Sequence, residues 1–85
     1  MTKEQALLDI DASGIKSGQL WRHYKGNVYC IIATALDENT LVPLVIYQSA
    51  DNKRDVVWSR PMAKFVSTVE GTVEHRFYPV FDKHE

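Results

Sequence analysis

The chain has one cysteine, three prolines, four glycines and no long apolar run among its 85 residues. The single thiol, Cys30, cannot form an internal disulfide, which favours a reducing compartment. No run reaches the roughly 18 apolar residues that a membrane-spanning helix needs. The N-terminal stretch MTKEQALLDIDAS carries acids where a secretory signal has its apolar core. We therefore expect a cytoplasmic protein that does not enter a membrane.

A strong charge of one sign is also lacking. The formal net charge is −1, whereas domains that bind nucleic acid mainly through phosphates are usually clearly basic. The distribution is less even than the total, because acids are absent between Asp11 and Asp37. Four basic side chains fall inside that interval: Lys16, Arg22, His23 and Lys25. The segment is therefore locally positive in a nearly neutral chain.

The first fourteen residues have the pattern of a short helix. Thr2 followed three residues later by Gln5 resembles a capping box, and Gly14 suits the left-handed residue after a helix. Its expected apolar side consists of Ala6, Leu7 and Ile10. About two turns of helix are not stable alone. We therefore expect this helix to dock on the rest of the chain or on a second copy, which would make a homo-oligomer.

Residues 18–81 have the pattern of a small β domain. Runs rich in aromatic and β-branched residues alternate with turns, and little helix is indicated. An 85-residue chain has room for one modest core. We expect a mainly β fold with five to six short strands. The two candidate architectures are a small SH3-like barrel and a strongly bent antiparallel sheet, with the short helix at the N-terminus.

Glycine and proline mark the expected strand ends. Gly26-Asn27 lies between two aromatic-rich runs and predicts a two-residue hairpin loop. Pro43 predicts a strand start, a bulge or an edge, and Pro61 predicts the end of a strand. Residues 66–80 predict two short strands on either side of a central glycine. Between these strands, residues 61–65 are expected to form a single tight turn.

Most aromatic side chains are expected in the core, because a small β domain has few other large residues. A stacking platform of the kind found in single-strand-binding barrels is the functional alternative. Strand alternation places Trp21 and His23 on one face, and Leu20 and Tyr24 on the other. If the second face points inward, Trp21 and His23 are displayed to solvent.

No motif for catalysis or metal binding is present. Three histidines are present, and none has the spacing to Cys30 that a metal site needs; they are His23, His75 and His84. The chain also has neither a nucleophile elbow nor a glycine-rich loop that binds phosphate. A Cys–His pair through His23 or His75 stays open, without a supporting motif. We expect no metal, no cofactor and no enzymatic activity.

The stretch WSRP contains the best candidate for a binding site. Trp58 and Arg60 are two residues apart, so they share one face of a strand that Pro61 ends. An arginine beside an indole can stack on it or hold a carboxylate or phosphate in its fork. The structural alternative is an arginine that pairs with a nearby acid. Arg76, before Phe77, permits the same two interpretations.

Four motifs together resemble a bacterial family known as domain-of-unknown-function family 1653. They are G-x-x-W-R-H-Y-K-G-x-x-Y at 18–29, T-L-x-P-L-V-I-Y at 40–47, W-S-R-P-x-x-x-F at 58–65 and R-F at 76–77. The resemblance covers most of the chain from Gly18 to Val80 and leaves out the N-terminal helix. It implies a compact, β-rich, cytoplasmic bacterial domain and no established activity.

The resemblance transfers a framework and no catalytic role. The framework residues are His23, Tyr24, Lys25, Gly26, Trp58, Arg60, Pro61, Arg76 and Phe77. The chain departs from the family pattern at two positions: Asp37 stands where members often have His, and Val42 where they often have Glu. Any chemistry that those two polar residues perform in the family is lost here.

We therefore expect a non-enzymatic binding module for an acidic peptide or a small anionic ligand. Its expected ligand-binding residues rim a shallow pocket: His23, Lys25, Trp58, Arg60 and Arg76. A small nucleic-acid-binding barrel is the first alternative, because the aromatic and basic residues suit it. An enzyme that lacks a recognisable motif is the second.

Overall fold

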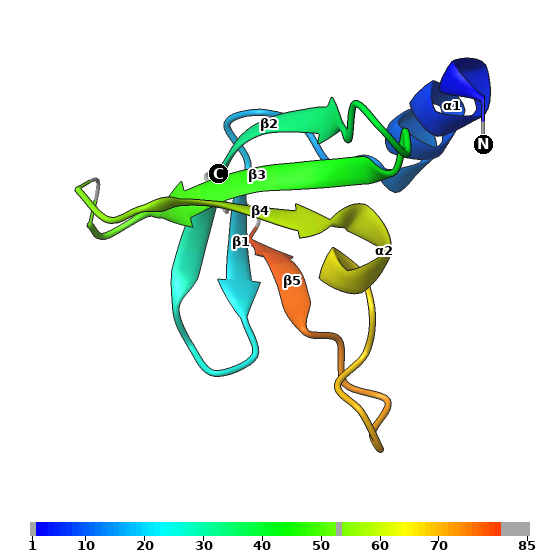
Figure 1. Cartoon of the computed structure of the whole chain (residues 1–85). Helices are drawn as coiled ribbons and strands as arrows, with labels where there is room; N and C mark the ends of the chain where they lie inside the picture. Colours follow the sequence, from blue (N-terminus) through cyan, green and yellow to red (C-terminus); the bar gives the residue numbers. More distant parts are fainter. Residues whose placement is uncertain (1, 53, 81–85) are drawn as a thin grey trace, which may run out of the picture.

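The computed structural model describes residues 2–52 and 54–80, and Figure 1 shows their arrangement. Position 81, where the β domain was expected to end, and His84 lie outside the described residues. In chain order the elements are α1 (Lys3–Ser13), β1 (Leu20–His23), β2 (Val28–Leu36), β3 (Pro43–Ser49), β4 (Val57–Pro61), α2 (Met62–Phe65) and β5 (Phe77–Val80). The expected mainly β fold with a short N-terminal helix is confirmed.

The five strands form one antiparallel sheet in the order β4-β3-β2-β1-β5. The two end strands do not pair with each other, so a closed barrel is not confirmed. The sheet is strongly bent: β1 and β5 run steeply across the direction of β3 and β4 (Figure 1). The register of β2 on β3 shifts between Ile31 and Ala33. Such a bulge increases the local twist and bends a strand.

Helix α1 begins and ends where its capping residues predicted. The Thr2 hydroxyl accepts a hydrogen bond from the Gln5 backbone N–H at 3.1 Å. The Gln5 side chain instead donates to Asp9, so only half of the capping box forms. Gly14 adopts φ 74°, and its N–H donates to the Asp11 carbonyl. The left-handed conformation ends the helix, as glycine permits.

The apolar side of α1 differs in part from the expected one. Ala6 is buried and Ile10 packs against the core. Leu7 is 46% exposed and Leu8 is 60% exposed. The helix lies beside the start of β3, at one end of the sheet (Figure 1). It thus buries one narrow stripe and leaves its leucines in solvent.

The β1–β2 loop is one residue longer than predicted. The N–H of His23 donates to the Asn27 carbonyl at 2.7 Å, and the Gly26 N–H donates to the His23 carbonyl at 2.7 Å. The loop is therefore the three residues 24–26, with Gly26 at φ 112°. A type I turn followed by a positive-φ glycine is a common three-residue hairpin connection. The expected two-residue loop through Asn27 is wrong, because Asn27 already belongs to the ladder.

Residues 66–76 contain one strand fewer than predicted. Only an isolated bridge joins Thr68 to His75, and the regular strand β5 begins at Phe77. The Val69 N–H bonds the Glu74 carbonyl, so the segment is a short hairpin-like turn. Val73 at its tip is 94% exposed. Val66 is 42% exposed as well, so the segment buries little of the apolar surface that a regular strand packs against its neighbours.

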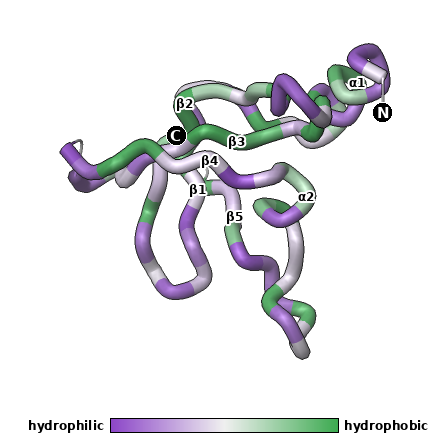
Figure 2. The backbone as a smooth tube through the Cα atoms, viewed as in Figure 1, coloured by the Kyte–Doolittle hydropathy of each residue, from purple (hydrophilic) through white to green (hydrophobic). Residues whose placement is uncertain are grey.

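The core lies between α2 and one face of the bent sheet. The rings of Phe65 and Phe77 stack with centroids 4.2 Å apart and planes at 10°. Trp21 contacts Phe65 edge-on at 5.3 Å. Figure 2 shows the hydrophobic residues that run along β2 and β3. The remaining buried members of the cluster are Ile15, Ile31, Val45, Tyr47 and Met62.

The face of β1 that carries Trp21 and His23 points to this core. Both side chains are half-buried, whereas Leu20 on the other face is 40% exposed. The arrangement that would have displayed Trp21 and His23 is therefore not the one observed. Most aromatic residues belong to the core, as predicted, while Trp58 and Tyr78 are exposed. Among the described helices, none is both long and apolar enough to cross a membrane.

Candidate functional site

All five strands contribute a side chain to one cleft on the core-facing side of the sheet. Tyr47 pairs with Trp58, and His23 with Phe77, so these residues share a face. The cleft has a volume of about 210 Å³. We call it the Arg60 cleft, and its lining residues are His23, Tyr29, Tyr47, Trp58, Arg60 and Phe77.

Arg60 is held in the cleft by aromatic groups. Its Nε donates a long hydrogen bond to the Tyr47 hydroxyl, at 3.4 Å. Its guanidinium carbon lies 5.8 Å from the centroid of the Phe77 ring, within the range of a cation–π contact. Within residues 2–52 and 54–80, no carboxylate pairs with this half-buried guanidinium. Its terminal N–H groups are therefore free to bind an anion.

His23 lines the cleft on the same side of the sheet as Arg60. Burial lowers the pKa of His23, and the positive charges of three neighbours lower it further; they are Lys25, Arg60 and Arg76. Its Nδ1 accepts a hydrogen bond from the Lys25 backbone N–H at 3.2 Å. In the neutral ring the proton is therefore on Nε2. A bound anion would oppose these three charges and raise the pKa of His23.

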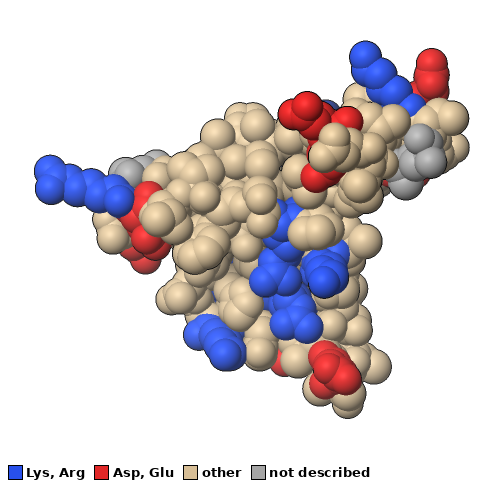
Figure 3. Space-filling view, in the orientation of Figure 1, with Lys and Arg blue, Asp and Glu red and all other residues tan. Residues whose placement is uncertain are grey.

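Lys25 and Arg76 flank the cleft without lining it. Lys25 is exposed on the β1–β2 loop, with its Nζ 5.9 Å from the centroid of the Tyr24 ring. Arg76 precedes β5, and its carbonyl accepts a hydrogen bond from the Tyr24 N–H at 2.9 Å. Both cations act on His23 through space. In Figure 3 Lys and Arg side chains gather over the region of β4, α2 and β5, while acids lie toward the margins of that face.

Trp58 forms an accessible wall of the cleft. It is 47% exposed, although it lies directly opposite the buried Tyr47 on the next strand. An indole that is half in solvent can stack against a ligand without disturbing the core. The structure thus brings together three of the five sequence-predicted site residues, and places the other two beside them.

The sequence did not indicate Tyr29 and Tyr47 as cleft residues. Tyr29 contacts Tyr47 edge-on, with ring centroids 5.3 Å apart. Tyr29 also pairs with Trp21 across the hairpin, so alternation alone would have placed it on the face of His23. That inference needs the correct loop length, because a one-residue change of register exchanges the two faces. For Tyr47 no local signal exists, because its position depends on the β2 bulge.

The family comparison agrees with the motifs in the sequence. The model of a family described as "Protein of unknown function (DUF1653)" matches residues 19–80. The chain belongs to this family. No curated protein and no solved structure matches it. The bacterial origin that the resemblance implies remains a prediction.

The two departures from the family pattern meet at one turn. The N–H of Asp37 donates to the Val42 carbonyl at 3.0 Å, so the residues face each other across the β2–β3 connection. The Asp37 carboxylate accepts hydrogen bonds from the Asn39 and Thr40 N–H groups at 2.9 Å each, and these bonds lower the pKa of Asp37. Asp37 therefore stabilises the turn. Neither position lines the Arg60 cleft.

A larger groove lies between α1, the start of β3 and α2. Its volume is about 500 Å³, and most of its lining is apolar; the lining residues are Asp9, Ser13, Val42, Pro43, Met62, Ala63 and Val66. It contains one carboxylate and one hydroxyl, and the Ser13 hydroxyl already donates to the Ile10 carbonyl. The groove is therefore large, but its lining has no cluster of polar side chains that could together bind one ligand. The smaller Arg60 cleft combines a guanidinium, an imidazole and two tyrosine hydroxyls, and is therefore the better candidate for a binding site.

Cys30 does not approach His23. It pairs with Leu20 across the hairpin, and therefore lies on the sheet face opposite to Tyr29 and His23. Its thiol contacts the Ile31 carbonyl at 3.7 Å. The Cys30–His23 nucleophile pair is thus wrong. Among the described residues, no three His, Cys, Asp or Glu side chains are grouped as metal ligands.

Proposed function

We propose that the chain is a non-enzymatic binding module whose Arg60 cleft holds the carboxylate of an acidic peptide or a small anionic ligand. One observation carries the proposal: Arg60 is positioned by the Tyr47 hydroxyl and the Phe77 ring, with no carboxylate partner in the described part of the chain. A charge that is half-buried and unpaired is costly. An anion from outside the fold would satisfy it.

The size of the cleft fits one charged group. Its volume of about 210 Å³ is below the roughly 300–1,000 Å³ of pockets that enclose drug-sized ligands. Such a space suits a single carboxylate or phosphate with the first atoms attached to it. Trp58 would cover the apolar part of the ligand, and Arg60 would hold its charge in two parallel hydrogen bonds.

The pKa of His23 supports anion binding in a second way. Neutral His23 offers an N–H donor from Nε2 and adds no charge of its own. Protonation would add a cation beside Arg60, so a bound anion and a bound proton should favour each other. Anion affinity should therefore rise as the pH falls through the pKa of His23.

Nucleic acid is the alternative ligand, because Trp58 and Arg60 combine an exposed ring with a cation. The net charge of −1 weighs against it. An enzyme is the other alternative. Among the six residues that line the cleft, the nucleophilic groups are the hydroxyls of Tyr29 and Tyr47 and the imidazole of His23.

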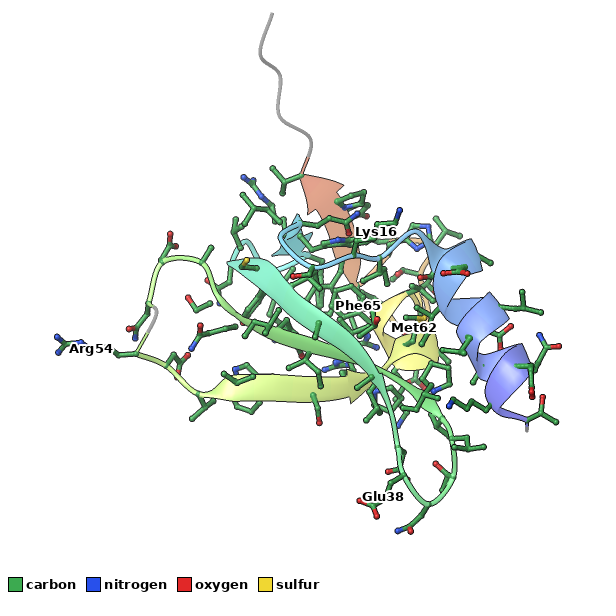
Figure 4. The ribbon with its side chains drawn as sticks, turned by 90° about the horizontal axis from the view of Figure 1, so that it is seen from above. Lys16, Glu38, Arg54, Met62 and Phe65 are labelled. Carbon is green, nitrogen blue, oxygen red and sulfur yellow. The ribbon has the colours of Figure 1, made fainter. Side chains whose placement is uncertain are left out.

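Tryptophan fluorescence tests the proposal. Titration with inorganic phosphate, and separately with acetate, should change the emission of Trp58 and have no such effect in Trp58→Phe. Arg60→Gln should abolish the response. Arg54→Gln is the matched control, because Arg54 lies at the remote β3–β4 turn (Figure 4). A response that survives Arg60→Gln, or one produced only by oligonucleotides, would contradict the proposal.

A further inference from the structure

Among the strands of residues 2–52 and 54–80, β4 and β5 lie at the two ends of the sheet, and each has one side that pairs with no described strand. A free edge presents N–H and C=O groups that can pair with another extended segment. Figure 4 shows β4 at the margin of the sheet, with β3 on one side and no other strand on its free side. The two edges differ in what their main chains offer to a partner.

Hydrogen bonds just beyond the ends of β3 show which of its residues direct their main-chain N–H and C=O groups toward β2. The Ala50 N–H donates to the Val28 carbonyl at 3.0 Å, and the Asp37 N–H donates to the Val42 carbonyl at 3.0 Å. Main-chain groups in an antiparallel ladder point alternately to the two neighbouring strands. The even-numbered residues of β3 therefore point toward β2, and the odd-numbered residues point toward β4.

This alternation fixes the free edge of β4. Tyr47 is the partner of Trp58, so the main chain of Trp58 is directed at β3. The N–H and C=O groups of Val57 and Ser59 therefore point away from the sheet. Both residues are exposed, Val57 to 53%. At Pro61 the pattern ends, because proline has no N–H.

The free edge of β5 is a poorer template. Tyr24 donates its N–H to the Arg76 carbonyl, so by alternation Tyr78 also pairs with β1. Phe77 and Pro79 then face the free side. Pro79 has no N–H to offer, which blocks regular strand addition in the middle of β5. Of the two edges, β4 is the one with consecutive outward donors and acceptors.

Arg60 limits what can pair with β4. A charged side chain that points to the core-facing side of an edge strand is a known device against edge-to-edge association. A neutral strand laid along β4 would cover the half-buried guanidinium and leave it unpaired, which is costly. A strand with an acidic residue on that same face would instead pair with Arg60. The residue that prevents general association thus selects an acidic partner.

We propose that an extended acidic polypeptide segment binds by adding a strand to the free edge of β4, with one Asp or Glu side chain inserted in the Arg60 cleft. This inference rests on the proposed function, because the cleft supplies the anion site. The main-chain groups of Val57 and Ser59 provide affinity for any extended peptide, and Arg60 provides selectivity for the acid. Trp58 packs against the side chain next to it on the same face.

The test begins with selection of nine-residue peptides from a random displayed library. Selected peptides should contain Asp or Glu flanked by β-branched or aromatic residues, without central proline. One selected peptide is then synthesised with N-methyl groups at single positions. Methylation of the amides that face β4 should weaken binding about tenfold each, whereas methylation of the intervening amides should not. This alternation is specific to strand addition, and it needs no change in the protein.

Two variants complete the test. Ser59→Pro removes an outward N–H and should weaken binding of the selected peptide without altering the response to inorganic phosphate. Arg60→Gln should weaken both. If peptide binding is insensitive to the position of N-methylation, strand addition is wrong while a phosphate response dependent on Arg60 keeps the cleft proposal. If neither phosphate nor acidic peptides bind, both proposals are wrong. Should Ser59→Pro fail to fold, the methylated peptides alone decide.

Discussion

The side chains of Tyr47 and Arg60 meet across two neighbouring strands, with the hydroxyl oxygen 3.4 Å from Nε. Tyr47 is buried to 7% exposure, and its ring contacts Phe77 and Phe65. The aromatic core therefore continues directly into the cleft. A rigid phenol that holds one N–H of a guanidinium leaves the others oriented for a ligand, which is how a site is preorganised.

The first prediction concerns this contact. Tyr47→Phe keeps the ring and removes the hydroxyl that accepts from Arg60. We expect about 1 kcal/mol of lost stability at most, and phosphate affinity lowered about threefold to tenfold. Denaturant unfolding and tryptophan fluorescence titration measure the two effects. Unchanged phosphate affinity in a well-folded Tyr47→Phe protein would show that the hydroxyl does not position Arg60.

The second prediction concerns pH. Because burial and neighbouring cations lower the pKa of His23, the unfolded chain binds more protons between the folded pKa and the ordinary value of 6.5. The free energy of unfolding should therefore decrease as the pH falls below 6.5, and level off below the folded pKa. In His23→Gln this slope should be shallower. Urea unfolding at a series of pH values measures this slope in both proteins. An identical slope in the wild type and His23→Gln would contradict a lowered His23 pKa in the folded protein.

The third prediction links that pKa to the ligand. Inorganic phosphate should raise the pKa of His23, because it opposes the charges of Lys25, Arg60 and Arg76. NMR titration of the imidazole protons, with and without phosphate, measures the change directly. The same titration in Arg60→Gln should show a His23 pKa closer to its ordinary value and a smaller response to phosphate. If phosphate does not change the pKa of His23, then His23 is not part of the anion site.

The fourth prediction distinguishes the observed hairpin from the expected one. Gly26 has φ 112° with no atom within 4 Å of an added Cβ, so Gly26→Val introduces strain without a clash. We expect a cost of about 1–3 kcal/mol. Asn27→Val is the control: Asn27 has no positive φ and should tolerate the substitution. Thermal unfolding of both variants measures the two losses of stability. Equal losses for Gly26→Val and Asn27→Val would favour the two-residue loop.

Local signals in the sequence predicted the ends of elements well. Thr2 and Gly14 cap α1, Pro43 begins β3 and Pro61 ends β4, because each acts through its own backbone geometry or hydrogen bond. The three-residue loop was missed by one position, since Gly26-Asn27 fits two turn types equally well. The extra strand predicted before Gly71 does not form, and Val66 and Val73 on either side of this glycine stay exposed.

The sequence predicted only some of the residues that line the Arg60 cleft. His23, Trp58 and Arg60 were singled out from residue type and spacing, and the fold places them on one face. Tyr29 and Tyr47 were not, because their places depend on a hairpin register and a bulge that no local pattern specifies. Long-range register is a property of the packed sheet.

The fifth prediction concerns self-association, which we propose for the exposed side of α1. Leu7 and Leu8 are 46% and 60% exposed, while Ala6 on the same helix is buried. If the two leucines join two copies, the double substitution Leu7→Gln, Leu8→Gln should lower the mass measured by light scattering and leave the melting temperature of the monomer unchanged. A mass that does not depend on these leucines would exclude this interface.

The most direct test of the binding account is a thermal melt of Arg60→Gln with and without inorganic phosphate. Phosphate at about ten times its Kd should raise the wild-type melting temperature by about 5 °C or more. If Arg60 holds the anion, Arg60→Gln should cost at most about 1 kcal/mol, and phosphate should no longer raise the melting temperature of this variant. A loss of several kcal/mol, together with an unchanged response to phosphate, would contradict it and make Arg60 a structural arginine.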